Sequence, residues 1–323
     1  MANKQLSSAF LDRNDFSSYA TGWLYDCEIR QHSPRTVELR KTIIDKFEWW
    51  LDQKQISRID AMSLRQFLHY VANGHKEEGG RWGDPLKNTA PKPATVQLYH
   101  RHIRACLNWI VEEGAIDASP MKTIKAPIDR PDQIQPFSTE QVGLLLAACK
   151  KGRMWRRDEA ICLLLLDTGI RVSELTSLNK SDLDISVRSA VVEGKGGKKR
   201  TINFGTRTAR ALWAYQNTLG ERPDDDPVFV SQNRERMTPN GVLQMMNRLE
   251  RESGVTGIRV SPHTFRHTCA VMFLRNGGNQ FTLMNMLGHT DTQQTNRYVN
   301  FAQADVAKQH RQFSPVESLR KRR

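Results

Sequence analysis

The sequence Ser-Pro-His-Thr-Phe-Arg-His-Thr-Cys at 261–269 leads through an apolar run to Leu-Gly-His-Thr at 287–290 and Asn-Arg-Tyr at 296–298. Serine followed by proline is typical of a helix start, because serine caps free N–H groups and proline fits the first helical position. His263 and Arg266 are three residues apart and therefore share one helix face. The positive end of that helix and the guanidinium favour an anion such as phosphate. A tyrosine beside such a site can be a nucleophile, because charge developing on the phosphate is already compensated.

Net charge sets this chain apart from an ordinary globular protein. Lysine and arginine number 48 against 35 aspartate and glutamate, a formal charge of +13 with a pI near 9.7. Most of the excess lies after residue 130. An excess of this size favours a polyanion through counterion release. A basic but merely solvated surface stays open on charge alone, so the motifs must decide.

The composition otherwise indicates a globular chain of two domains. At 323 residues, with 38% hydrophobic and 26% charged residues, it is long enough for two cores. No apolar run approaches the roughly 20 residues of a membrane span, and the first residues lack the layout of a signal peptide. Five scattered cysteines, with no Cys-x-x-Cys, favour buried free thiols in a reducing compartment. We expect a cytoplasmic, nucleoid-associated protein without membrane contact.

Helical periodicity dominates the first part of the chain. Residues 1–20 are polar with scattered aromatics and are expected to form a loose leader that passes into a helix. Apolar residues at steps of three, four and seven then predict about four helices over residues 21–113. Four glycines and three prolines at 74–93 predict a loop whose flexibility stays open. Residues 114–137 contain four prolines and no sustained period, which indicates a linker.

Residues 138–323 change from helix to strand and back. Ser138 and Gln141 have the spacing of a capping box, and a more apolar helix is predicted at 158–168 before Gly169. Short strand candidates lie at 183–185, 190–193 and 200–204, with a glycine-rich turn at 194–198. Further helices are expected at about 206–219, 239–253, 262–276, 280–287 and 292–312.

Four strings in this order resemble the tyrosine recombinase (phage integrase) family of site-specific DNA recombinases. They are Asp-Thr-Gly-Ile-Arg-Val-Ser-Glu-Leu at 167–175, Gly-Lys-Gly at 194–196, His-Thr-Phe-Arg-His at 263–267 and Leu-Gly-His at 287–289, with a tyrosine nine residues later. Each string alone is weak, but their order and separations are specific. The resemblance covers residues 138–312, and residues 20–113 are similar to the helical core-binding domain of that family.

The resemblance implies a mainly α fold with a small β-sheet. A helical, SAM-like core-binding domain would occupy residues 21–113, between the leader and the linker. A mixed α/β catalytic domain would occupy residues 138–323, and the two domains would form a clamp around duplex DNA. The segment after Tyr298 would pack on a neighbouring subunit, although packing on its own domain stays open. Its apolar residues are Phe301, Val306, Phe313, Val316 and Leu319.

The resemblance also implies a catalytic set, which is Arg171, Lys195, His263, Arg266, His289 and Tyr298. The arginines would hold one phosphate as bidentate forks, which lysine cannot copy. The lysine would protonate the leaving 5′-oxygen. The first histidine would bond a phosphate oxygen or exchange a proton with the tyrosine, and the second would stabilise the transition state. A free phenol has a pKa of about 10, so the tyrosine must lose its proton as it attacks.

Plainer interpretations of these residues stay open. Arg171 can be a surface arginine paired with Glu174, and a lysine in a glycine turn is usually solvated. His263 can be a helix-start histidine without a task, His289 a capping residue, and Tyr298 a core residue. Two other residues match the family pattern, Glu174 and His267, and are expected in a supporting position. Lys198 is a fallback for Lys195 in the same turn. Basic residues that could face DNA, each equally well explained by a solvated face, are Arg35, Lys41, Lys87, Lys92, Arg101, Arg104 and Lys198.

A metal site is the alternative interpretation of the two histidines. His263 and His267 are one helical turn apart, as in zinc sites, but no glutamate follows His263 and no cysteine cluster supplies further ligands. Carboxylate clusters typical of magnesium nucleases are missing as well. We therefore expect neither metal nor cofactor.

The resemblance implies an enzyme that breaks and rejoins DNA. Tyr298 would form a 3′-phosphotyrosine, leave a free 5′-hydroxyl and lead to strand exchange through a Holliday junction. The partners would be double-stranded DNA with specific recombination sites, further copies of the chain in a homo-tetramer on paired sites (a monomer or weak oligomer when free), and accessory DNA-bending proteins. The loop at 74–93 favours integration or excision of a mobile element. The alternatives are Xer-type resolution of chromosome or plasmid dimers, a type IB topoisomerase, and a non-catalytic DNA-binding protein on the same scaffold.

Overall fold

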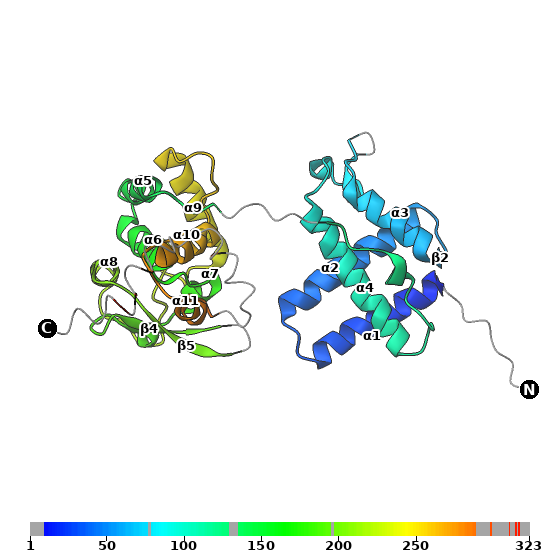
Figure 1. Cartoon of the computed structure of the whole chain (residues 1–323), viewed down its shortest axis with the longest axis horizontal. Coiled ribbons are helices and arrows are strands. Elements are labelled where there is room, and N and C mark those ends of the chain that lie inside the picture. Colours follow the sequence, from blue (N-terminus) through cyan, green and yellow to red (C-terminus); the bar gives the residue numbers. More distant parts are fainter. Residues whose placement is uncertain are drawn as a thin grey trace, which may run out of the picture. The chain divides into compact units, whose positions relative to one another are not determined.

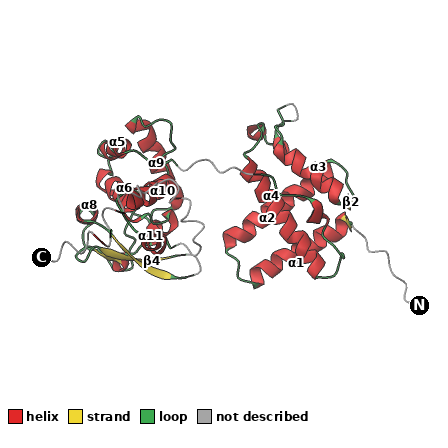
Figure 2. Ribbon diagram, viewed as in Figure 1, coloured by secondary structure: helices red, strands yellow, loops and turns green. Residues whose placement is uncertain are grey.

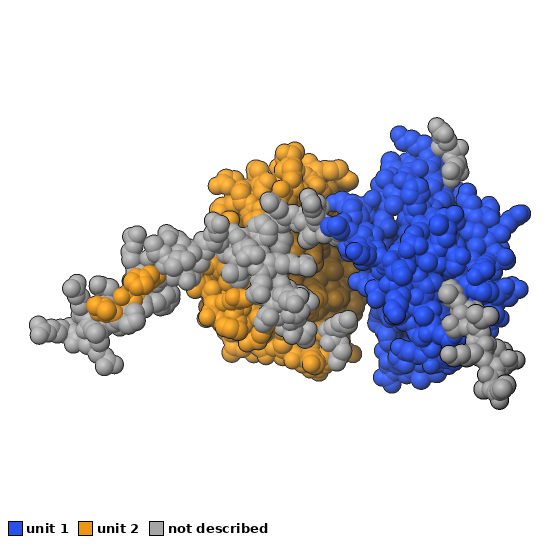
Figure 3. All heavy atoms as spheres, turned by 45° about the vertical axis from the view of Figure 1, so that its right-hand side comes forward, with its two compact units in different colours: residues 1–132 blue, residues 133–323 orange. Residues whose placement is uncertain are grey.

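The chain forms two compact units, Met1–Asp132 and Gln133–Arg323, each with its own hydrophobic core (Figure 3). The computed structural model describes residues 10–76, 79–128, 135–194 and 197–288, together with Tyr298, His310, Ser314 and Val316. Helices make up most of the described part of both units, and the strands of the second unit gather along one side (Figure 2). No helix within these described residues is long and apolar enough to cross a bilayer.

The first unit is built from α1 (Arg13–Ile29), α2 (Pro34–Gln53), α3 (Ala61–Ala72) and α4 (Pro93–Glu112) (Figure 1). Side-chain caps account for the starts of the first three, because the oxygens of Asp12, Ser33 and Asp60 accept from free N–H groups of the first turn. Two short strands, β1 (Leu11–Asp12) and β2 (Arg58–Ile59), pair antiparallel and tie the start of α1 to the start of α3. The helices bury a core rich in Phe, Trp, Ile and Leu.

The helical part of this unit extends beyond the predicted limits at both ends. The first helix begins at Arg13, before the predicted boundary at residue 21, because Phe16 and Ala20 already belong to the core. The start of the predicted linker also packs inward: a 3₁₀ turn, η3 (Pro120–Thr123), places Met121 and the nearby Ile124 against the same core. The prolines of the predicted linker remove the helical period from its sequence, but they do not prevent its apolar side chains from being buried.

The segment after α3 is anchored rather than loose in its described residues. It contains two 3₁₀ turns, η1 (Arg81–Gly83) and η2 (Pro85–Lys87). The Trp82 ring stacks on Tyr99 with centroids 5.8 Å apart and meets the edge of Tyr70 at 5.2 Å. The buried Arg81 guanidinium donates to the Thr89 carbonyl at 2.7 Å, which closes the segment on itself. The ring contacts of Trp82 therefore hold this segment on the helices, and the buried Arg81 guanidinium stabilises its closed conformation.

Gly80 allows that docking, and this can be tested with its neighbour as control. Gly80 has φ +92°, and a Cβ there would lie 1.8 Å from the Asp84 carbonyl oxygen. Gly79 also has a positive φ, +73°, but a Cβ there would meet nothing within 4 Å. Gly80→Ala is expected to lower the free energy of unfolding by roughly 2 kcal/mol more than Gly79→Ala. Urea denaturation followed by tryptophan fluorescence measures the difference, and equal losses would refute the proposed close approach.

The second unit begins with α5 (Thr139–Cys149), α6 (Trp155–Thr168) and α7 (Val172–Ser177). An antiparallel sheet follows after the 3₁₀ turn η4 (Lys180–Asp182), with strand order β3 (Leu183–Asp184), β4 (Ser189–Glu193) and β5 (Lys199–Asn203). The remaining α-helices in the described part of this unit are α8 (Thr206–Gln216), α9 (Pro239–Ser253), α10 (Pro262–Arg275) and α11 (Gln280–Leu287). The predicted helix at 292–312 lies outside the described residues, apart from Tyr298 and His310.

Helix α6 is the centre of this unit. It is apolar on most of its surface and packs against α8 and α10, as expected of a buried helix. The one carboxylate buried along it, Asp158, is held by Arg157 on α6 and Arg248 on α9, so the buried charge is paired. All five cysteines of the chain are buried free thiols, as the sequence predicted. Cys149 and Cys162 lie closest to each other in this core, with sulfurs 3.8 Å apart.

Candidate active site

The corner between α6 and α7 places the first candidate arginine. Gly169 ends α6 in the left-handed conformation, with φ +61°, and Arg171 is the N-cap of α7. A Cβ on Gly169 would lie 2.6 Å from a methyl group of Leu287 at the end of α11. Glycine is therefore required at 169 both by the backbone conformation and by the close approach of α11. The side chain of Arg171 leaves this rigid corner half-exposed.

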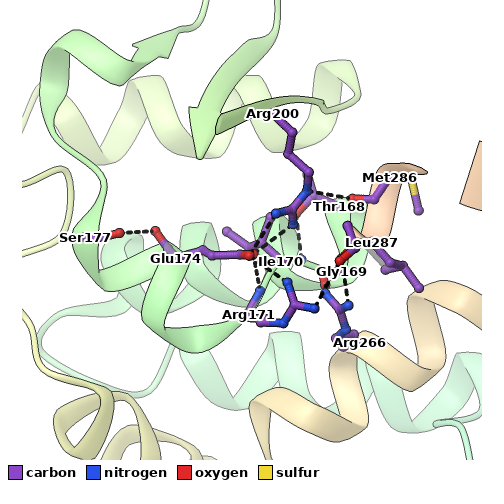
Figure 4. A network of polar contacts seen from close by, with 11 residues as sticks. Thr168, Gly169, Ile170, Arg171, Glu174, Ser177, Arg200, Arg266, Met286 and Leu287 are labelled. Carbon is purple, nitrogen blue, oxygen red and sulfur yellow. Dashed lines mark hydrogen bonds and ion pairs between the residues drawn. The ribbon is translucent and has the colours of Figure 1, made fainter. Parts of the chain in front are cut away.

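Glu174 on α7 is the hub of a polar network (Figure 4). Its carboxylate, with the side chain 2% exposed, accepts from the Arg171 backbone N–H at 2.8 Å and from Arg171 Nη1 at 2.9 Å. Arg200 on β5 donates to both carboxylate oxygens, each at 2.8 Å. Burial alone would raise the pKa of Glu174, but the hydrogen bonds from Arg200 and Arg171 outweigh it and hold the pKa below its ordinary value. The carboxylate thus stays ionised between two guanidinium groups.

Arg266 on α10 brings a third guanidinium to the same place. Its side chain is buried, and it donates from Nη1 to the Gly169 carbonyl at 2.6 Å and from Nη2 to the Leu287 carbonyl at 2.8 Å. Arg171 Nη2 donates to the next carbonyl, that of Gly288, at 3.3 Å. Burial, reinforced by the charge of Arg171, lowers the pKa of Arg266 to about 10. Three positive side chains around one carboxylate make a site that suits an anion.

Two histidines and the tyrosine lie beside these arginines. His263 and His267 are one turn apart on α10, and their rings meet edge to face with centroids 4.5 Å apart. His267 Nδ1 lies 2.9 Å from the Tyr298 hydroxyl oxygen. Tyr298 is 5% exposed and belongs, with Leu287, to the small core formed by α10 and α11. The tyrosine also lies near enough to Arg266 for its charge to raise that pKa.

The arginines act on His263 as well. The side chain as a whole is exposed, yet partial desolvation of the ring lowers its pKa, and the positive charges of Arg266 and Arg171 act in the same direction. The neutral imidazole is therefore favoured at neutral pH. A neutral imidazole can accept a proton as well as donate a hydrogen bond.

The structure thus brings six of the residues predicted from the sequence into one site: Arg171, Glu174, His263, Arg266, His267 and Tyr298. Lys195 and His289 lie outside the described residues. The fallback Lys198 is exposed in the hairpin, where its carbonyl accepts from the Gly194 N–H at 2.8 Å. Of the apolar residues predicted to pack on a neighbouring subunit, only Val316 is described, and it is 65% exposed. The others lie outside the described residues: Phe301, Val306, Phe313 and Leu319.

The candidate DNA-binding residues of the first unit are all exposed: Arg35, Lys41, Lys87, Lys92, Arg101 and Arg104. Lys87 forms an ion pair with Asp84 at 2.8 Å. Exposure agrees with a DNA-binding face and with a solvated face, so their role stays a prediction.

Arg200 is the site residue that the sequence analysis missed. It lies on the same face of β5 as the buried Ile202, because side chains alternate along a strand. A charged residue on the inward face of a strand requires a partner. That period-two pattern was the signal in the sequence, although it does not identify the partner.

Comparison with known proteins decides the family. The model of the phage integrase family matches residues 136–304, more than half of the chain. The chain belongs to this family, the tyrosine recombinases. Its members are enzymes that cleave and rejoin DNA, so the predicted family and enzyme class are confirmed.

Similar proteins match over most of their length. Tyrosine recombinase XerC of Pseudomonas fluorescens (strain Pf0-1) is 30% identical over 275 residues, 84% of this chain and 87% of that protein. Tyrosine recombinase XerD of Oceanobacillus iheyensis is 29% identical over 237 residues, 71% of this chain and 79% of that protein.

Solved structures establish the fold of this tyrosine recombinase. A XerH site-specific recombinase bound to its palindromic difH substrate is 16% identical, covers 94% of this chain and 85% of that chain, and has a TM-score of 0.65. The Tn1549 transposon integrase bound to transposon right end DNA is 19% identical, covers 92% and 99%, and has a TM-score of 0.66. The predicted fold class, mainly α with a small sheet, is confirmed.

The electrostatics of the site predict how His263 titrates. In the free protein its pKa is expected below the ordinary 6.5, because desolvation and two guanidinium groups oppose protonation. Arg171→Gln removes one of those charges and is expected to raise the pKa of His263. Arg188→Gln, an exposed arginine outside the network, is the matched control and should leave it unchanged. Proton NMR titration, with His263 assigned by its loss in His263→Gln, measures both, and a fall of the pKa in Arg171→Gln would contradict the arrangement.

Proposed function

We propose that this chain is a site-specific DNA recombinase in which Tyr298 attacks a phosphodiester held by Arg171 and Arg266. The observation that carries the proposal is their convergence on the end of α11. Arg266 and Arg171 donate to the carbonyls of Leu287 and Gly288, and Tyr298 belongs to the same small hydrophobic core as Leu287. A phosphate held by these guanidinium groups would therefore lie near the phenol, which already interacts electrostatically with Arg266. Preorganised donors of this kind stabilise charge that develops in the transition state.

The proposed reaction forms one phosphorus–oxygen bond for each one that it breaks. The Tyr298 oxygen forms a bond to phosphorus, the bond to the 5′-oxygen breaks, and the products are a 3′-phosphotyrosine and a free 5′-hydroxyl. Attack by the 5′-hydroxyl of a partner strand reverses the step, so no other energy source is required. The proton of the phenol is taken up as the bond forms, and His267 Nδ1, 2.9 Å from the hydroxyl, is positioned to accept it. Lys195 would protonate the leaving oxygen and His289 would bond the phosphate, as the family resemblance implies.

Assembly on DNA is part of the same proposal. Strand exchange needs two duplexes, hence a homo-tetramer on paired recombination sites, a Holliday junction and, where the sites require bending, accessory DNA-bending proteins. Support comes from the excess of 13 positive charges on this chain, which favours a polyanion. Among the similar proteins, the XerH recombinase was solved bound to its difH substrate and the Tn1549 integrase in complex with transposon right end DNA. Such a protein would act in the cytoplasm, at the nucleoid.

A covalent complex tests the chemistry. Duplexes selected for binding to this protein and nicked near the site should give an adduct that survives denaturation, because the nicked strand end diffuses away after cleavage. Tyr298→Phe should abolish the adduct while binding persists, since only the hydroxyl is lost. His267→Phe keeps a ring in place but removes the acceptor, and it should slow adduct formation about 100-fold at pH 7 and less at pH 9. Binding without any adduct in the wild-type protein would support the non-catalytic alternative and overturn the proposal.

Two biological roles use this chemistry. Xer-type resolution of chromosome or plasmid dimers is favoured by the similarity to proteins named XerC and XerD over most of the chain. Integration or excision of a mobile element is the second candidate, suggested by the inserted segment at residues 74–93. Relaxation by a type IB topoisomerase mechanism would need only one duplex.

Pairs of sites separate these roles. Dimer resolution joins two identical sites, whereas integration joins an element end to a different target. Two identical selected sites on one plasmid should therefore recombine at least tenfold faster than mismatched pairs, a ratio that corresponds to about 1.4 kcal/mol. Equal or faster recombination of unlike sites would favour the mobile-element role. Relaxation of a plasmid that carries a single site would favour the topoisomerase.

A further inference from the structure

Arg200 connects three segments that carry candidate catalytic residues. It lies on β5, five residues after Lys195 in the sequence. From there its guanidinium donates to both oxygens of Glu174 on α7, each at 2.8 Å, and Nε donates to the Met286 carbonyl at the end of α11 at 3.2 Å. The side chain is only 16% exposed. Figure 4 shows its guanidinium directed at Glu174 and at Met286. A largely buried guanidinium with three hydrogen bonds holds its partners in a fixed geometry, which a solvated surface arginine does not.

The guanidinium of Arg200 also lies close to the end of α11. Gly288 terminates α11 with φ +62°, and a Cβ on it would lie 2.9–3.1 Å from the guanidinium atoms of Arg200. Any other residue at 288 would push the guanidinium away. The same Gly288 supplies the carbonyl that accepts from Arg171. Arg200 therefore fixes both the carboxylate and the backbone on which Arg171 rests.

The donors around Glu174 show what this arrangement does for Arg171. The carboxylate receives four hydrogen bonds, two from Arg200 and two from Arg171, one of the latter through its backbone N–H. Only Nη1 of the Arg171 side chain is bound to Glu174, whereas the other end of the fork reaches the Gly288 carbonyl. A guanidinium has five N–H donors, so Arg171 keeps donors for an anion. Without Arg200, a buried carboxylate would have Arg171 as its main partner.

We propose that Arg200 is a positioning residue of the recombinase: by occupying Glu174 and the end of α11, it leaves the charge and the remaining donors of Arg171 to the scissile phosphate. This inference rests on the proposed function and deepens it. It also explains why the site holds three arginines although a single phosphate is gripped by two. The third neutralises the carboxylate that orients the first.

The test compares Arg200 variants in single-turnover cleavage of the nicked duplex. Arg200→Met keeps the length of the side chain but leaves Glu174 charged beside Arg171, and adduct formation is expected to slow about 100-fold, as for a misplaced binding group. Arg200→Lys retains the charge but not the bidentate guanidinium, so its rate of adduct formation should lie between those of the wild-type protein and Arg200→Met. Arg188→Met, an exposed arginine outside the network, is the matched control and should cleave like the wild-type protein. Cleavage by Arg200→Met within threefold of wild type would overturn the proposal.

A double variant distinguishes positioning from general stability. In Arg200→Met with Glu174→Gln the competing charge is gone, so cleavage should recover at least tenfold relative to Arg200→Met alone. If Arg200 only stabilises the fold, cleavage per folded molecule should be the same in the single and the double variant, and any recovery should match the gain in folded protein. Thermal unfolding of each variant reports folding separately.

A second readout does not depend on catalysis. Carbon-13 NMR of the Glu174 carboxyl should show its pKa raised in Arg200→Met, because the largest opposing hydrogen bond to burial is lost. An unchanged pKa would contradict the proposed contact even if the wild-type protein formed no adduct. Absence of an adduct in the wild-type protein together with a raised pKa would refute the proposed function while leaving the contact intact.

Discussion

The buried carboxylate of Glu174 is the constraint on which the site depends. An ionised carboxylate at 2% exposure is stable only if it is paired and hydrogen-bonded, and Arg171 and Arg200 supply both. Because one arginine comes from the α6–α7 corner and the other from β5, a helix start and a strand are fixed to each other through one side chain. The candidate anion site is built around this internal ion cluster, so its geometry does not depend on a bound anion.

The end of α11 completes the arrangement through its backbone. Its last carbonyls have no partner within the helix, and those of Met286, Leu287 and Gly288 accept from Arg200, Arg266 and Arg171 respectively. The negative end of the helix dipole is thus placed against three cations, which is favourable. Glycine at 169 and 288 permits the close approach, since a Cβ at either position would meet a side chain closer than 3.0 Å. Helix termini and two glycines therefore do as much for the site as the charged residues.

Local signals predicted the helices well and the long-range contacts poorly. The start of α10 at Pro262 follows from Ser261, and the start of α5 from the Ser138–Gln141 box, because capping is a property of neighbouring residues. The family strings gave six residues of the site. Arg200 was missed because its partners are 26 and 86 residues away in the sequence. The anchoring of the segment after α3 was missed for the same reason: Trp82 is held by rings from α3 and α4, and composition alone indicates only a loop.

The setting of the phenol follows from these contacts. Tyr298 is packed among apolar side chains of α10 and α11, and His267 is the hydrogen-bond partner of its hydroxyl at 2.9 Å. An ionised phenol is costly in such surroundings unless positive charge lies near it. The guanidinium of Arg266, the residue next to His267 on α10, supplies that charge, because Arg266 and Tyr298 interact electrostatically. His267, the proposed proton acceptor, and Arg266, which supplies the positive charge, are thus adjacent residues of one helix, so a small displacement of α10 would alter both together.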